Sequence, residues 1–165
     1  MRQEGAGVDL GTSLGYLLKE ASSALRASIE SVLRPLGMTV THYACLELLA
    51  QRPGLSNSDL ARGAFVTRQS MNVLLQSLER DGYVTRPAEA PFGKALPASL
   101  TSSGRHSLAR ATVAVRSIEE RMLARLTGQD EADARRILSS VIVSLTQSGV
   151  GPDPSGSPQK RALKE

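Results

Sequence analysis

The sequence predicts a mainly α-helical protein with a small β-hairpin. The chain has 165 residues, 41% apolar and 22% charged, which suits one domain with a substantial core. It holds only two Phe, three Tyr and no Trp, so we expect a core of Leu, Ala, Val and Ile, which favours helix packing over a β-sandwich. Helical spacing of apolar residues is broken only between residues 83 and 101, where several Pro and Gly exclude a helix.

The first predicted helix spans residues 12–36 and follows a polar, glycine-rich start, residues 1–11, that we expect to be flexible. Its main apolar line repeats with helical spacing at Leu14, Leu18, Ala21, Leu25, Ile29 and Val32. A weaker second line lies at Leu17, Ala24, Leu33 and Leu36. So broad an apolar surface needs more partners than one small domain offers, which predicts a dimer interface.

Three further helices follow. Thr39 is the expected N-cap of the second helix, and Ser56 opens a short third helix in capping-box form, with Asp59 in the usual place of Glu or Gln. After a two-residue turn, Thr67 caps a longer helix that stops at Gly82. Two helices separated by a few residues, the second one longer, predict a helix-turn-helix.

A two-stranded hairpin is expected next. Residues 83–86 and 98–101 carry Val and Thr, which favour strands, and the hairpin tip should lie near residues 90–94. The prolines between the two segments limit the strands to a few residues each.

Two long helices are expected at the C-terminal side. The first, residues 104–126, should be capped by Ser102 or Ser103 and bury Leu108, Val115, Ile118, Met122 and Leu126. The second, residues 130–147, should bury Ala134, Ile137, Leu138, Val141, Ile142 and Leu145. Residues 148–165 are poor in apolar side chains and predict a disordered tail.

The positive charge is concentrated in the middle of the chain. The net charge is only +4, but residues 55–110 hold seven basic and four acidic side chains, while the flanking thirds are nearly balanced. This segment contains the predicted helix-turn-helix, so the excess favours nucleic acid as a partner.

Four segments together resemble the MarR family of bacterial transcription regulators: PGLSNSDLA at 53–61, VTRQSMN at 66–72, LERDGYV at 78–84 and LTSSGR at 100–105. The likeness covers about residues 10–147. It implies a winged helix-turn-helix homodimer that binds palindromic double-stranded DNA and is often released by a small phenolic or lipophilic effector. The expected function is a transcriptional regulator, more often a repressor than an activator.

The resemblance also implies a domain organisation. Residues 12–147 would form a single domain, with the winged helix-turn-helix at 39–101 and dimerisation helices at 12–36 and 104–147.

The helix after Thr67 has the face expected of a DNA-reading helix. Met71, Leu74, Leu75 and Leu78 form its buried stripe, and the opposite face holds Gln69, Val73, Gln76 and Arg80. Gln and Asn can pair with adenine, and Val can contact a thymine methyl group. Including the wing, the predicted DNA contacts are Thr67, Arg68, Gln69, Ser70, Asn72, Val73, Gln76, Arg86 and Lys94.

The wing departs from the family pattern. Many members carry Asp-x-Arg at the hairpin tip, and the matching places here hold Phe92, Gly93 and Lys94. Lysine lacks the planar fork of arginine, so we expect Lys94, supported by Arg86 at the hairpin base, to supply mainly phosphate attraction.

His42 and Tyr43 lie on the second helix, near the place where the family keeps its ligand crevice, and are the candidate effector contacts. Cys45 lies among leucines and predicts a buried, inert thiol. Two His and one Cys alone make a thin ligand set for a transition metal, which only carboxylates could complete, so we expect no metal and no cofactor.

Two alternatives differ in class. An enzyme would need a nucleophile with its base, paired carboxylates, a phosphate loop or a metal, and the sequence shows no such set. A winged-helix dimer without specific DNA binding would be a protein-interaction module, and the altered wing leaves that alternative open. The chain has no apolar run long enough for a membrane helix and no hydrophobic signal core, which predicts a cytoplasmic protein.

Overall fold

The computed structural model describes residues 9–86 and 98–147. In chain order its elements are α1 (Leu14–Leu33), a 3-10 turn η1 (Arg34–Leu36), α2 (Val40–Gln51), α3 (Asn57–Gly63), α4 (Arg68–Arg80), β1 (Val84–Thr85), β2 (Ser99–Leu100), α5 (Ser102–Leu123) and α6 (Gly128–Gln147). The mainly α fold with a small hairpin is confirmed. The chain up to Met122 forms one compact unit and the chain from Leu123 forms a second, so α6 is described by itself.

Each of the helices α2, α3 and α4 begins at a hydroxyl side chain. The Thr39 Oγ1 accepts from the His42 backbone N–H at 3.2 Å and starts α2, and the Thr67 Oγ1 accepts from the Ser70 backbone N–H at 3.1 Å and starts α4. At α3 the capping box is complete, because Ser56 accepts from the Asp59 backbone N–H and donates its own N–H to the Asp59 carboxylate. The three predicted caps are confirmed.

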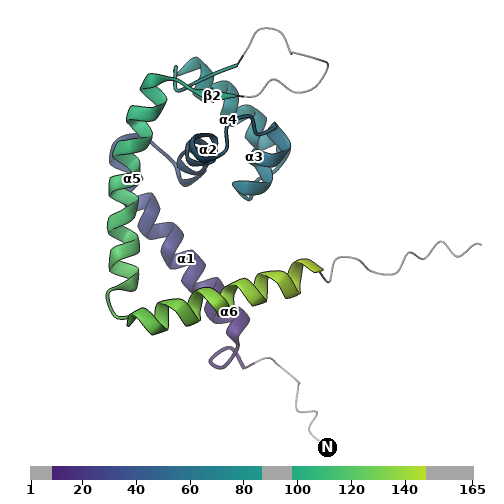
Figure 1. Cartoon of the computed structure of the whole chain (residues 1–165), viewed down its shortest axis with the longest axis vertical. Helices are drawn as coiled ribbons and strands as arrows, with labels where there is room; N and C mark the ends of the chain where they lie inside the picture. Colours follow the sequence, from purple (N-terminus) through teal and green to yellow (C-terminus); the bar gives the residue numbers. More distant parts are fainter. Residues whose placement is uncertain (1–8, 87–97, 148–165) are drawn as a thin grey trace, which may run out of the picture. The chain divides into compact units, whose positions relative to one another are not determined.

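The core of the first unit is built from α2, α3 and α4, which gather beside the two strands (Figure 1), with the end of α1 and part of α5 packed against them. Its largest fully buried side chains are Leu33, Cys45, Leu46, Leu60, Met71 and Leu78. One prediction for α1 needs correction, because Leu33, from the weaker apolar line, is its buried residue. The six residues of the main line are exposed or half-exposed in a single chain, as expected if they pack against a second copy.

The hairpin is an antiparallel pair in which Val84 faces Leu100 and Thr85 faces Ser99. Val84 is buried and Thr85 is exposed, the alternation expected of a strand with one face on the core. The expected hairpin tip and Lys94 lie outside the described residues.

The helix after the hairpin starts earlier than predicted. The Gly104 backbone N–H donates to the Thr101 Oγ1 at 3.0 Å, so Thr101 is the cap rather than Ser102 or Ser103. Leu108, Val115 and Ile118 are buried as predicted, whereas Met122 is 51% exposed and Leu126, beyond the helix end, is 44% exposed.

The last helix, α6, begins at the Thr127 cap, where the Asp130 backbone N–H donates to the Thr127 Oγ1 at 3.2 Å. Its predicted buried face is not buried in a single chain: none of the described α6 side chains is buried, and Ile142 and Leu145 are 60% and 73% exposed. Among the described residues, no helix is both long and apolar enough to cross a bilayer.

Candidate nucleic-acid interface and effector groove

The second helix of the helix-turn-helix, α4, presents one apolar and one polar face. Met71, Leu74, Leu75 and Leu78 are at most 8% exposed and anchor the helix in the core. The predicted DNA-contacting residues of the opposite face are all exposed: Thr67, Arg68, Gln69, Ser70, Asn72, Val73 and Gln76. The structure therefore brings these seven residues together on one solvent-facing surface, which we call the reading face.

Thr67 and Ser70 of the reading face bond to each other at the helix cap, but its amide side chains are uncommitted. The side-chain amides of Gln69, Asn72 and Gln76 make no hydrogen bond to another described residue. Val73 is 61% exposed, a large apolar side chain with nothing to cover it. Uncommitted amide donors and acceptors beside an exposed Val are the groups that can bind base edges in a major groove.

Within the helix-turn-helix, a side-chain bond fixes the start of α4. The Asn57 Nδ2, on the first residue of α3, donates to the Arg68 carbonyl at 3.2 Å. Together with the Thr67 cap, this bond holds the first turn of α4 against α3. The first turn of a recognition helix contacts the base edges, so its position decides which bases the side chains can reach.

Arg86, at the base of the hairpin, is tied to α4. Its Nε donates to the Glu79 Oε2 at 2.9 Å and its Nη2 donates to the same oxygen. The hydrogen bond from Arg86 holds the pKa of the Glu79 carboxyl below its usual value. Through this ion pair Arg86 links the base of the hairpin to α4. Its contact with DNA stays a prediction.

Sequence reasoning missed the residues that attach the hairpin to α5. The Thr101 Oγ1 donates to the Gly82 carbonyl at 2.7 Å, and the Thr101 backbone N–H donates to the Tyr83 carbonyl at 3.1 Å. A Cβ on Gly104 would lie 2.0 Å from the Tyr83 carbonyl oxygen, so only glycine fits there. The LTSSGR segment is part of the family resemblance, but only the three-dimensional structure shows what its Thr and Gly contact.

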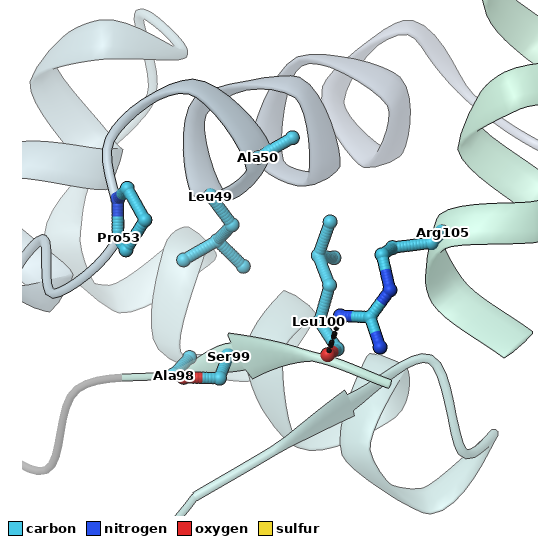
Figure 2. Close-up of a pocket in the computed structure, with 7 residues that line it drawn as sticks. All are labelled: Leu49, Ala50, Pro53, Ala98, Ser99, Leu100 and Arg105. Carbon is cyan, nitrogen blue, oxygen red and sulfur yellow. Dashed lines mark hydrogen bonds between the residues drawn. The ribbon is translucent and has the colours of Figure 1, made fainter. Parts of the chain in front are cut away.

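The other strand is held by Arg105. Its Nη1 donates to the Leu100 carbonyl at 2.8 Å, at the edge of a hollow of about 310 Å³ (Figure 2). Figure 2 shows Leu49 and Ala50 of α2, with Pro53 just beyond it, above this hollow, and Ala98–Leu100 along its floor. Both strands of the hairpin base are therefore fastened to helices, β1 to α4 through Arg86 and β2 to α5 through Arg105.

A larger groove of about 610 Å³ lies on another side of the first unit. Its walls come from α1, α2 and the turn before α4, and its lining residues are Ser22, Leu25, Arg26, Ile29, Val40, Thr41, Tyr43, Ala44, Glu47, Leu48, Gln51, Gly63, Ala64 and Phe65. Of the two predicted effector contacts, Tyr43 lines the groove and His42 does not. The α1 and turn residues were not predicted, because the rotation of α1 against α2 decides which side chains face each other.

Burial shifts the pKa of three titratable side chains on α2. It raises the pKa of Tyr43, so the phenol stays neutral, and it lowers the pKa of the half-buried His42. Cys45 is fully buried and its pKa is raised to about 12, which matches the predicted inert thiol. Among the described residues there is no cluster of His, Cys, Asp and Glu suited to a metal ion.

Comparison with known proteins decides the family. Residues 36–95 match the family model described as MarR family. The chain is 44% identical over 128 residues to the HTH-type transcriptional repressor Rv2887 of Mycobacterium tuberculosis, an alignment that covers 78% of this chain and 92% of that repressor. The chain belongs to the MarR family.

Solved structures of MarR-family proteins support the same assignment. The crystal structure of the M. tuberculosis protein Rv2887 with DNA has a TM-score of 0.65 at 43% identity, covering 78% of this chain and 97% of that one. The structure of the same protein with salicylic acid has a TM-score of 0.65 at 44% identity, covering 78% of this chain and 96% of that one. Like its relatives, this MarR-family chain is a DNA-binding transcriptional regulator with a winged-helix fold.

Proposed function

We propose that the chain is a homodimeric, cytoplasmic repressor that binds a palindromic operator and is released by a small aromatic acid. The observation that carries the proposal is the reading face of α4, an exposed surface of uncommitted amides around Val73. Relatives that are named repressors, and one solved with DNA, support it.

The proposed contacts divide between base reading and phosphate attraction. Gln69, Val73 and Gln76, flanked by Asn72, would meet base edges in the major groove. Arg68, in the first turn of α4, would reach a phosphate or a guanine, and Lys94 of the wing would attract phosphate. Phosphate contacts fix the register of the protein on the duplex and carry no sequence information.

Dimerisation would place two reading faces on one side of the DNA. Both α1 and α6 expose apolar side chains that a single chain leaves in water, among them Leu14, Leu17, Ile142 and Leu145. A two-fold dimer would bury such a surface and set two copies of α4 roughly 34 Å apart, one turn of the double helix.

The effector would occupy the groove that Tyr43 lines. A planar acid the size of salicylate fits within about 610 Å³, and Arg26, which pairs with Glu30 at 3.2 Å, supplies a cation in its lining. Because both α1 and the turn before α4 line the groove, its occupant would bias the position of the reading face. A difference of about 3 kcal/mol between the two states would weaken DNA binding by a factor of 100 or more.

A nuclease footprint on the DNA that flanks the coding region tests the proposal. We expect two protected half-sites whose centres lie one helical turn apart, and protection that fades when salicylate is added. A footprint with a single half-site would contradict the dimer, and protection unaffected by a panel of aromatic acids would contradict the effector. No protected sequence on any flanking duplex would favour the interaction module.

A further inference from the structure

The turn between α3 and α4 carries an aromatic side chain in an unfavourable place. Phe65 has a φ of +56°, the only non-glycine residue with a positive φ among those the structure describes. Its side chain is 95% exposed, the highest value for any large apolar residue in the described part. A bulky residue in this backbone region is strained, and an exposed ring gains nothing from burial.

The same helix ending recurs elsewhere in the chain with glycine. At the end of α4 the Tyr83 backbone N–H donates to the Leu78 carbonyl at 2.8 Å, and the left-handed residue between them is Gly82, with a φ of +76°. At the end of α3 the Val66 backbone N–H donates to the Ala61 carbonyl at 3.0 Å, and Phe65 occupies the left-handed place. The backbone therefore favours glycine at position 65, and neither packing nor conformation accounts for the ring.

The position of Phe65 supplies a reason. Phe65 and the two residues before it line the groove, together with Leu25 and Ile29 of α1. The turn lies close to α2, because a Cβ on Gly63 would lie 2.8 Å from the Leu48 Cδ1, and Leu48 also lines the groove. The ring thus stands at the rim of an apolar groove, two residues before the cap of α4.

We propose that Phe65 is the specificity residue of the groove, whose ring covers one face of a planar aromatic acid bound there. This inference rests on the proposed function, because it takes the occupant of the groove to be the effector. Aromatic rings attract each other in offset-stacked and edge-to-face arrangements beyond the effect of buried area. The exposed ring of Phe65 is therefore available to stack on an aromatic ligand.

The proposal also gives the effector a short route to the DNA-binding surface. A ligand held by Phe65 would pull on the backbone that leads directly to Thr67, the cap of α4. Saturated acids of the same shape would fill the groove but hold the turn less firmly. Selectivity for aromatic over saturated acids would therefore reside at position 65.

The test compares salicylate with its saturated analogue, 2-hydroxycyclohexanecarboxylate, by calorimetric titration of the full chain. The variant Phe65→Gly removes the ring and relieves the backbone strain, so it should fold and melt at an equal or higher temperature. We expect the native protein to prefer salicylate about three- to tenfold, and the variant to lose that preference. Phe65→Tyr, which keeps a ring, should retain it.

DNA binding separates the alternatives. We expect Phe65→Gly to bind DNA without ligand as the native protein does. If the variant keeps the native preference for salicylate, the proposal is overturned. It is also overturned if the variant loses DNA affinity or dimerisation while its salicylate affinity is unchanged, because the ring would then contact DNA or the second copy. If the native protein binds DNA specifically but neither acid, the effector part of the proposed function fails first, and this inference fails with it.

Discussion

At position 104 the contact between α5 and the hairpin leaves no room for a side chain, since an added Cβ would lie 2.0 Å from the Tyr83 carbonyl oxygen. The same oxygen accepts hydrogen bonds from the backbone N–H and the hydroxyl of Thr101. Backbone atoms held by two bonds cannot move aside as a flexible side chain would, so a methyl group must displace α5 or the strand.

Gly104→Ala should therefore lower the free energy of unfolding by about 3 kcal/mol, as measured by urea denaturation. Gly128→Ala is the matched control, because nothing lies within 4 Å of a Cβ on this helical glycine. The control should be neutral or slightly stabilising. Equal stability of both variants would contradict the close packing of Gly104 against the Tyr83 carbonyl.

The thiol of Cys45 should be unreactive in the folded protein. Burial raises its pKa to about 12, so almost no thiolate exists near pH 8. We expect no reaction with a thiol reagent until denaturant is added, and no effect of mild peroxide on DNA binding. Because the thiol ionises near pH 9 when unfolded and only near 12 when folded, its contribution to stability should decline between these two values. Rapid labelling of the native protein would contradict this assignment.

At the scale of elements, the hairpin depends on the link between Arg86 and Glu79. If the ion pair holds β1 against α4, then Arg86→Ala and Glu79→Gln should weaken DNA binding to a similar extent, and the double variant should be no worse than either. Anisotropy titrations on one operator duplex measure this. A rise in DNA affinity for Glu79→Gln would show instead that the released Arg86 reaches the phosphates.

Local signals predicted α2, α3 and α4 well, because their caps and apolar stripes act within one or two turns. The start of α5 was misplaced, since three hydroxyl residues in a row can each cap a helix and only the bonds from Thr101 to Gly82 and Tyr83 choose between them. The effector groove was predicted only through Tyr43. Its other walls depend on how α1 is rotated against α2, which no short sequence pattern determines.

At the scale of the whole molecule, the exposed apolar faces predict assembly. The periodicity of α6 correctly predicted an amphipathic helix, but periodicity does not say whether the covering surface comes from the same chain or another. In the described structure these side chains lack cover. We attribute this to a dimer interface that a single chain cannot complete.

Ile142→Glu should convert the dimer to a monomer. Residue 142 is 60% exposed in one chain but buried in the proposed dimer, and burying an unpaired charge there is costly. Light scattering after size exclusion measures the mass, and operator affinity should fall with it. Ser139→Glu, on the polar side of the same helix, is the control and should remain dimeric. If the Ile142→Glu protein stays dimeric, this face of α6 is not part of the dimer interface.

Binding of the purified protein to the DNA flanking its own coding region tests the central claim most directly. Fluorescence anisotropy would compare a flanking duplex with a scrambled one at two salt concentrations. We predict at least about 10³-fold tighter binding to one flanking duplex, a preference that persists at the higher salt. Equal and strongly salt-dependent binding to both duplexes would mean phosphate attraction alone, and would contradict a reading face that recognises bases.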